Sequence, residues 1–424
     1  MNFYDSSVTE RILIEQGLTS ASSPLEADVI LVNTCSVRAH AEERAWGTIG
    51  SLKRIKQKNP GLKIAVMGCM AERLGRKIVE LAPHINLVLG THHLRSVKLL
   101  LEPELADRRA IVKIGEAEKP YHELQGMSGN SVVAFVAAMK GCNSFCTYCV
   151  VPYTRGREKS RPIPEIVEEI KQLVEHQDRE ILLLGQNITA YGRDLNLKTG
   201  FLNLLEEVHK VDGVIRLRYL TPHPKDFSPA ILEGLKNLPR VPEYFHLPIQ
   251  SGDDEVLRAM NRGYTTADYL KLVDKIREEF PEFSLSTDVI VGFPTETEES
   301  FLNTLNLFRK VEFDYAYVAI YSHRPEALAS RLYPQDIPLK EKKRRHQILN
   351  QLQEETSFKK NQRLVGQVVE VLVEEFSRKH NAFSGRTRTN KIVSFPSEKT
   401  DLIGKLVNVH IEEAGSWVLR GGEI

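Results

Sequence analysis

The run Cys142-Asn143-Ser144-Phe145-Cys146-Thr147-Tyr148-Cys149 is the most informative stretch of this chain. It carries three of the five cysteines with the spacing C-x3-C-x2-C, and it follows an apolar run from Val132 to Ala138 that is typical of a strand. Three thiolates on one loop can bind three irons of a cubane [4Fe–4S] cluster and leave the fourth iron open for a small ligand. Structural zinc is the weaker interpretation, because four-cysteine zinc sites usually have two paired CxxC knuckles.

Composition narrows the class of protein. The 424 residues include 57 Lys and Arg against 56 Asp and Glu, so the net charge of +1 excludes a globally basic nucleic-acid coat protein. Five cysteines are too few and too unevenly spaced for a disulfide framework, which indicates a reducing compartment. The sequence has neither an apolar stretch long enough to span a bilayer nor a signal peptide. We therefore expect a cytoplasmic protein with no membrane partner.

The segment before the cysteine run predicts an open α/β sheet. Apolar runs at 28–32, 63–67 and 85–89 are typical of parallel strands buried on both faces, and helical segments at 41–58 and 71–81 separate them. Cys35 and Cys69 each come just after a strand. Because ligand sites in open α/β sheets lie at the carboxyl ends of strands, we expect these two cysteines to face one crevice.

The central segment predicts a partial (β/α)6 barrel. Strand candidates begin near residues 132, 181, 215, 244, 283 and 315, and helical segments separate most of them. In such folds the chemistry lies at the C-terminal ends of the strands. Polar residues at or near these ends are candidates for cofactor contacts, although they could equally satisfy loop backbone groups. They are Gln186, Asn187, Gln250, Ser251 and Asp288.

The last part of the chain predicts a basic helix and then a small β-barrel. Residues 339–361 read as a helix, and residues 362–424 switch to short runs with a period of two, typical of a barrel of OB-like size. The predicted class is therefore α/β with three domains: 1–112, 128–338 and, after the connecting helix at 339–361, the barrel at 362–424.

Longer motifs resemble the radical S-adenosylmethionine (radical SAM) superfamily and, within it, the methylthiotransferase family. The resemblance covers essentially the whole chain and matches the family's order of an N-terminal methylthiotransferase domain, a radical SAM domain and a C-terminal TRAM domain. The motifs that carry it are Asn33 to Arg38, Gly68 to Arg73, Gly141 to Arg161, Leu184 to Asn187, His246 to Gly252, Asp288 to Pro294 and Gly385 to Thr387.

The resemblance implies a reaction and its cofactors. Cys142, Cys146 and Cys149 would bind a catalytic [4Fe–4S] cluster that cleaves S-adenosylmethionine to a radical. Cys35 and Cys69 would bind a second, auxiliary [4Fe–4S] cluster that holds or supplies sulfur. The branch most similar to this chain converts N6-isopentenyladenosine at position 37 of tRNA to its 2-methylthio derivative. The implied partners are a tRNA anticodon stem-loop, an electron donor such as a flavodoxin or ferredoxin, and a sulfur source; the implied state is a monomer.

The N-terminus departs from the family pattern. By the resemblance, a third auxiliary-cluster cysteine ends a first strand, and the residues after it match Met1 to Ser6 of this sequence. We therefore expect this strand and cysteine to be missing here, and the auxiliary cluster to be impaired.

Basic residues predict contacts with RNA. Arg155, Arg157, Lys159 and Arg161 form a local patch beside the cysteine run, where phosphate contact is favoured over a solvated loop. In the barrel, Arg386, Arg388 and Lys391 are further candidates. Tyr148 is a candidate for contact with the cofactor's adenine, with packing as an equal alternative.

Two other functions stay open at this point. One is a methylthiotransferase that acts on threonylcarbamoyladenosine in tRNA or on a ribosomal protein. The other is a non-catalytic RNA-binding iron–sulfur protein, against which the complete three-cysteine motif argues.

Overall fold

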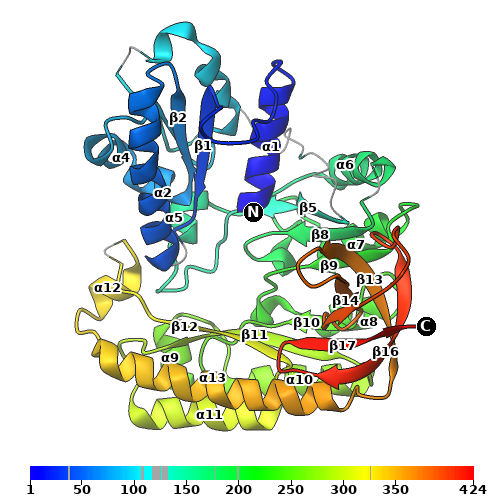
Figure 1. Ribbon diagram of the computed structural model, residues 1–424. Helices are drawn as coiled ribbons and strands as arrows, with labels where there is room; N and C mark the ends of the chain where they lie inside the picture. The colour runs from blue at the N-terminus through cyan, green and yellow to red at the C-terminus, as the bar shows by residue number, and fades with distance from the viewer. Residues whose placement is uncertain are drawn as a thin grey trace. The chain divides into compact units, whose positions relative to one another are not determined.

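The computed structural model describes residues 1–36, 39–106, 109–116, 126, 132–176, 178–197, 200–324 and 326–424 (Figure 1). It contains two compact units that interleave along the chain. The N-terminal unit comprises Met1–Gly129, Phe135–Asn143 and Cys149–Glu169; the C-terminal unit comprises Asn130–Ala134, Ser144–Tyr148 and Ile170–Ile424. The domain boundaries given above remain predictions.

The N-terminal unit is built on a parallel sheet. Its strands have the order β1 (Val29–Thr34), β2 (Lys63–Gly68), β3 (Leu87–Leu89) and β4 (Ile111–Lys113). All three strand pairs are parallel. The predicted open α/β sheet is confirmed.

Both faces of this sheet are covered. Helices α2 (Ala39–Lys58) and α4 (Arg76–Leu81) pack on the face that carries Ile64 and Val66. On the other face, α1 (Asn2–Ile14) contacts Met67, whose sulfur accepts a hydrogen bond from Thr9 at 3.8 Å. The single helix expected over 71–81 is two helices, because Gly75 (φ +49°) ends α3 (Cys69–Leu74) before α4 begins.

Further short elements complete the N-terminal unit. They are the 3₁₀ helices η1 (Leu94–Leu101) and η2 (Pro103–Ala106), the strand pair β6 (Met139–Lys140) and β7 (Lys159–Ser160), helix α5 (Val151–Arg155), and most of α6 (Ile163–Glu175).

The strands of the predicted partial barrel form two three-stranded sheets. One has the order β5 (Val133–Ala137), β8 (Glu180–Leu184), β9 (Arg216–Tyr219), and the other β10 (Tyr244–His246), β11 (Ser284–Val291), β12 (Tyr315–Ile320). All six strands begin within about two residues of the predicted positions. The intervening helices include α7 (Gly200–His209), α8 (Pro229–Leu235), α9 (Asp254–Ala259), α10 (Thr266–Glu279) and α11 (Glu298–Val311), and α12 (Leu328–Leu332) follows β12.

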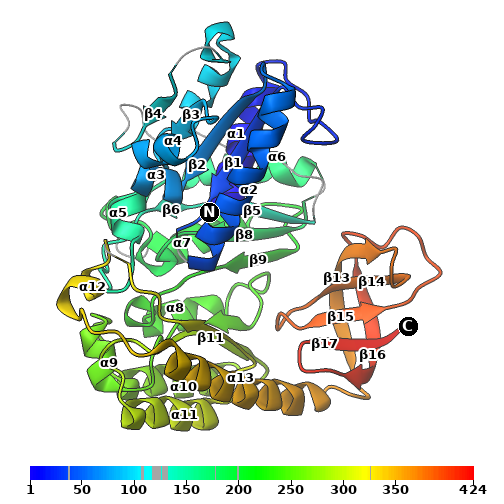
Figure 2. The same ribbon diagram turned by 60° about the vertical axis from the view of Figure 1, so that its left-hand side comes forward.

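The C-terminal part is a long helix followed by a closed barrel, as predicted. Helix α13 (Leu339–Gln362) leads into five strands with the order β13-β14-β15-β17-β16 (Figure 2). They are β13 (Val368–Ser377), β14 (Ala382–Thr387), β15 (Ile392–Phe395), β16 (Leu406–Ala414) and β17 (Val418–Glu423). The period-two runs of the sequence at 367–373, 392–395, 406–411 and 417–420 correspond to β13, β15, β16 and β17. The sequence did not predict β14, because a glycine and small polar residues interrupt its apolar pattern.

Over the part of the chain that the structure describes, no helix is both long enough and apolar enough to cross a lipid bilayer.

Candidate functional site

Arginine 262 lies against the middle cysteine of the motif, within the C-terminal unit. The Arg262 side chain is buried, and its Nη1 donates to Cys146 Sγ at 3.3 Å while its Nη2 donates to the Pro248 carbonyl at 2.8 Å. Burial by itself lowers the pKa of Arg262, but Tyr148, Tyr264 and Cys146 beside it outweigh burial and raise the pKa. A positive charge therefore faces the Cys146 sulfur.

Backbone contacts fix the same loop. Thr147 donates through its N–H to the Met260 carbonyl (3.0 Å) and through its hydroxyl to the Ala259 carbonyl (2.8 Å). Phe145 has a φ of +47°, which is costly for a residue with a side chain. Such strain persists only where the surroundings impose it, often at functional sites.

The two outer cysteines of the motif belong to the N-terminal unit. Gly141, which precedes Cys142, has a φ of +80°, and a Cβ there would lie 2.0 Å from the Arg157 carbonyl oxygen. Glu158 accepts a hydrogen bond from the Asn143 N–H at 3.0 Å. The Val151 N–H points at Cys149 Sγ at 3.5 Å.

The donor chemistry of these three residues fits iron. All five cysteines are free thiols, and Cys146 and Cys149 each receive a hydrogen-bond donor at sulfur, as cluster ligands do. Among the residues that the structure describes, no three His, Cys, Asp or Glu side chains already form a metal-binding group. The assembly of the thiols around a metal therefore stays a prediction.

Cys35 and Cys69 follow two residues that are register partners. Thr34 on β1 pairs with Gly68 on β2, so the cysteines directly after them leave neighbouring strands at the same edge of the sheet. Gly68 has a φ of +96°, and a Cβ there would lie 2.4 Å from the Thr34 carbonyl oxygen. Only glycine therefore permits this approach of the two strand ends.

A buried ionic group accompanies these cysteines. Arg155 pairs with Asp5 at 2.7 Å, and both side chains are almost fully buried. The Lys140 ammonium donates to the Thr91 carbonyl, and burial lowers the pKa of Lys140 to about 7. The charges of Asp5 and Cys69 act in the opposite direction on this pKa, which places Lys140 in the electrostatic neighbourhood of Cys69.

The structure corrects the RNA-contact expectation for part of the basic patch. Arg155 is paired with Asp5, and Arg161 is buried against Glu169 at 2.6 Å. Local sequence shows a run of charge, but both carboxylates come from other segments of the chain. Arg157 and Lys159 are exposed and keep their predicted role.

The barrel residues proposed for RNA contact are also used internally. Arg386 pairs with Glu374 (3.2 Å), Arg388 with Glu243 (2.7 Å) and Lys391 with Asp314 (2.6 Å). Glu243 and Asp314 precede β10 and β12, so Arg388 and Lys391 help to dock the barrel within the C-terminal unit. The RNA contacts of Arg386, Arg388 and Lys391 stay predictions.

The candidate cofactor residues lie near strand ends. They differ in whether their side chains already form hydrogen bonds within the protein. The Asn187 side chain donates to Asp226 at 2.7 Å, and Ser251 accepts from the Asp253 N–H at 3.3 Å, so both satisfy local groups. Gln250, which follows β10 and forms an isolated bridge with Val289 on β11, has a φ of +74°, a strained value. Gln186 is half-buried in the turn after β8, and the Asp288 carboxylate is 37% exposed.

Arg262 was missed from the sequence, whereas Tyr148 was predicted with two alternative roles. Arg262 gives no local signal, because its sulfur partner lies 116 residues earlier in the chain. Tyr148 packs partly against a cluster around Phe293, and the Arg262 guanidinium donates to its hydroxyl at 3.4 Å, which supports a packing role beside any cofactor role.

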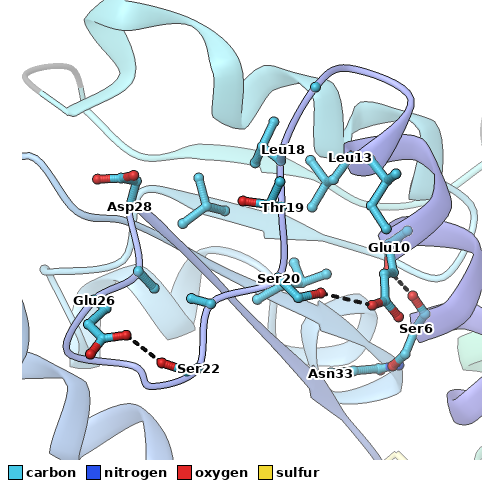
Figure 3. A pocket seen from close by; sticks show the side chains of 17 residues that line it. Ser6, Glu10, Leu13, Leu18, Thr19, Ser20, Ser22, Glu26, Asp28 and Asn33 are labelled. Carbon is cyan, nitrogen blue, oxygen red and sulfur yellow. Dashed lines mark hydrogen bonds between the residues drawn. The ribbon is translucent and has the colours of Figure 1, made fainter.

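One cavity lies elsewhere in the N-terminal unit. It has a volume of about 820 Å³ and is bounded by α1, β1 and the segment between them (Figure 3). Ser20 donates to Glu10 at 3.4 Å across its wall. No cysteine is among the described residues that line it, so volume alone does not identify the chemical site.

Family comparisons match the chain in three parts. The Radical SAM superfamily matches residues 136–308, the Uncharacterized protein family UPF0004 matches residues 1–90, and the TRAM domain matches residues 362–422. Among solved structures, the radical S-adenosylmethionine methyltransferase TsrM from Kitasatospora setae is similar, with a TM-score of 0.55 at 15% identity over 74% of this chain and 71% of that one. This likeness concerns the fold alone.

Curated relatives are much more similar. The tRNA-2-methylthio-N(6)-dimethylallyladenosine synthase of Caldicellulosiruptor saccharolyticus is 43% identical over 99% of this chain and 90% of its own length. The synthase of the same name from Moorella thermoacetica is 44% identical over 99% of this chain and 95% of its own. The chain belongs to the family of tRNA-2-methylthio-N(6)-dimethylallyladenosine synthases, within the radical SAM superfamily.

Proposed function

We propose that this chain is a tRNA methylthiotransferase that converts N6-isopentenyladenosine at position 37 to its 2-methylthio derivative. The observation that carries the proposal is the C-x3-C-x2-C loop, with donors from Arg262 and the Val151 N–H directed at its sulfurs, in a member of this family. Carbon 2 of adenine carries an unactivated hydrogen that no general base can remove, so radical chemistry suits this substrate.

Cys142, Cys146 and Cys149 would hold the catalytic [4Fe–4S] cluster, whose fourth iron would bind S-adenosylmethionine. When bound, this pair supplies the radical that removes hydrogen from carbon 2. The chain's own residues have supporting tasks: Arg262 keeps a positive charge at Cys146, and Gly141 with Glu158 shapes the turn that carries Cys142. Asp288, whose carboxylate is partly open, offers an acceptor for a nucleoside hydroxyl or amino group.

Cys35 and Cys69 would ligate the second cluster, at the adjacent ends of β1 and β2. These two thiolates leave the other irons of a cubane to ligands beyond this pair. Lys140 and Arg155 bring positive charge to the same region, which offsets the negative charge of thiolate-bound iron.

The substrate and partners follow from this assignment. The exposed Arg157 and Lys159 would contact phosphates of a tRNA anticodon stem-loop. An electron donor of the flavodoxin or ferredoxin class and a sulfur source would be needed, and we propose a cytoplasmic monomer.

A pair of matched variants tests the proposal after anaerobic reconstitution. Cys146→Ser should lose about four irons per chain and release no 5′-deoxyadenosine on reduction with S-adenosylmethionine. Cys69→Ser should keep 5′-deoxyadenosine release but lose the 2-methylthio nucleoside that the wild type, with its impaired auxiliary cluster, still forms in digested tRNA, as measured by mass spectrometry. Release of 5′-deoxyadenosine by Cys146→Ser, or a wild-type product on another nucleoside, would contradict the assignment.

A further inference from the structure

His223, in the loop after β9, is a buried histidine that uses one of its two ring nitrogens inside the protein. The residue is 7% exposed. Its Nδ1 accepts a hydrogen bond from the Lys225 N–H at 3.3 Å, which caps the 3₁₀ helix η5 (Pro224–Asp226). Its Nε2 is also buried, and it has no hydrogen-bond partner among the residues that the structure describes. Buried polar atoms are rarely left in this state, because desolvation without a hydrogen bond costs free energy.

The contact at Nδ1 fixes the tautomer of His223. A backbone N–H can only donate, so Nδ1 must present a lone pair to Lys225. In a neutral imidazole the proton is then on Nε2. Burial and the positive charge of Arg262 lower the pKa of His223 to about 3, so the ring is neutral at physiological pH. Nε2 is therefore a buried, uncharged N–H donor.

Two loops hold the backbone of His223 in place. Thr221 has a φ of +60°, which is rare for a β-branched residue, and its hydroxyl donates to the Gly185 carbonyl in the loop after β8. The His223 N–H donates to Thr189 Oγ1 at 3.1 Å, and Thr189 in turn donates to Asn187 Oδ1 at 2.8 Å. Backbone strain of this kind persists only where the surroundings impose it, and it is concentrated at functional sites.

Two side chains connect the His223 ring to the cysteine motif within the C-terminal unit. The ring packs against Tyr264, with centroids 5.7 Å apart and an interplanar angle of 76°. Arg262 Nε donates to the Tyr264 hydroxyl at 3.0 Å, while Arg262 Nη1 donates to Cys146 Sγ at 3.3 Å. These four side chains form one contiguous group. His223 follows the carboxyl end of β9, and folds of this kind bind their ligands at the carboxyl ends of the strands.

We propose that the Nε2–H of His223 binds an acceptor atom of an adenine nucleoside, either a ring nitrogen or a ribose oxygen. An uncharged donor suits an uncharged acceptor of this kind, whereas an anionic group is bound more strongly by a charged donor such as a guanidinium. The proposed reaction involves two adenine nucleosides, S-adenosylmethionine and the N6-isopentenyladenosine of the tRNA. In this respect the inference rests on the proposed function.

Two substitutions separate the roles of the two ring nitrogens. His223→Asn places an oxygen near the position of Nδ1, where it can accept from the Lys225 N–H, but it removes the donor at Nε2. His223→Gln reaches the position of Nε2 with its amide nitrogen but removes the acceptor at Nδ1. His176→Asn is the matched control, because His176 is an exposed histidine between α6 and β8, at the opposite edge of the sheet from the carboxyl ends of the strands.

Binding to the reconstituted full-length protein is measured with two probes. They are S-adenosylmethionine, by equilibrium dialysis, and an isopentenylated tRNA anticodon stem-loop, by fluorescence anisotropy. His223→Asn should bind one of the two probes about tenfold more weakly, as expected for the loss of one buried hydrogen bond, and His223→Gln should stay within about threefold of the wild type. His176→Asn should change neither affinity. The affected probe shows whether His223 contacts the cofactor or the substrate.

The opposite pattern would assign His223 to the cap of η5 alone. Wild-type affinity for both probes in His223→Asn, or an equal loss in His223→Gln, would overturn the proposal. These affinities do not depend on turnover, so they can fail even if the chain forms the 2-methylthio nucleoside.

NMR of the wild-type protein supplies the test if a variant does not fold. With ¹⁵N-histidine labelling, the ring of His223 should be in the Nε2–H form at neutral pH, and its Nε2–H resonance should shift when one of the two probes is added. An Nδ1–H tautomer, or an Nε2–H resonance that neither probe shifts, would overturn the proposal.

Discussion

Two cysteines of the N-terminal unit directly follow a glycine. We call these dipeptides, Gly68-Cys69 and Gly141-Cys142, the two Gly-Cys steps. Both glycines have a positive φ, +96° and +80°, and a Cβ at either would strike a backbone carbonyl oxygen, that of Thr34 at 2.4 Å or that of Arg157 at 2.0 Å. Each cysteine thus follows a glycine at which the chain passes too close to neighbouring backbone to accommodate a side chain. Cysteines that bind a metal need a fixed backbone position of this kind, because the protein must preorganise the ligands for the metal.

The surroundings of the two steps differ. Cys69 is 3% exposed and begins helix α3 at the end of a strand pair, so its position follows from the register of the sheet. Cys142 is half-buried on a loop, and its position depends on hydrogen bonds such as that from the Asn143 N–H to Glu158. The first step is fixed by the fold, and the second by local contacts that substitutions can remove one at a time.

Gly141→Ala should have the largest effect. The new Cβ meets backbone, which cannot move aside as a flexible side chain could, so the Cys142 turn must open. We expect loss of the catalytic cluster and at least a hundredfold lower 5′-deoxyadenosine release, measured after anaerobic reconstitution. Gly366→Ala is the matched control, because Gly366 has a φ of +83° and no atom within 4 Å of the added Cβ. Equal losses in both variants would show that φ strain alone is responsible.

Gly68→Ala should displace Cys69 without affecting Cys142. Its Cβ would push the end of β2 away from Thr34, and with it Cys69 away from Cys35. The radical motif lies outside this contact, so 5′-deoxyadenosine release should persist while formation of the 2-methylthio nucleoside falls about tenfold or more. The ratio of the two products, measured by mass spectrometry, checks this. A parallel fall in both would mean that the two steps are not independent.

Sequence predicted the scaffold of both steps well. Apolar runs predicted the strands that end before Cys35 and Cys69. The spacing of the C-x3-C-x2-C motif by itself predicted an iron–sulfur cluster. Strand β14 was missed because Gly385 and its polar neighbours carry no apolar period, although pairing with β13 and β15 fixes them in the barrel.

The environment of the candidate site could not be predicted in the same way. The sequence shows Arg155 and Arg161 as part of a basic run, and only the fold brings Asp5 and Glu169 to them. Arg262 contacts Cys146, which lies 116 residues earlier in the chain. Residues of this kind are set by tertiary packing, which leaves no local pattern to detect.

Asp5→Asn should destabilise the N-terminal unit by about 2 kcal/mol at neutral pH, since it leaves Arg155 buried without a counter-charge. Burial by itself raises the pKa of Asp5, but Arg155 and Lys140 outweigh burial and lower the pKa below 3.8. A lowered carboxyl pKa stabilises the fold above the unfolded value and loses this effect as pH falls through the folded value. The difference between wild type and variant in chemical denaturation should therefore shrink below about pH 4. A difference that does not change between pH 7 and pH 3 would contradict this ion pair.

The smallest effects should come from the glutamates that brace the two steps. Glu158 accepts from the Asn143 N–H, and Glu72, three residues after Cys69, accepts from the N–H groups of Thr91 (3.0 Å) and Gly115 (2.7 Å). Replacement by glutamine keeps the shape but weakens charge-assisted bonds, at a cost of about 1 kcal/mol each. Glu158→Gln should lower 5′-deoxyadenosine release a few-fold. Glu72→Gln should leave the methylthio product nearly unchanged, because β-sheet register and not the carboxylate fixes Cys69. If Glu72→Gln instead proves as damaging as Gly68→Ala, the position of Cys69 depends on the Glu72 carboxylate as much as that of Cys142 depends on Glu158. The distinction between a cysteine fixed by the fold and one fixed by local contacts would then fail.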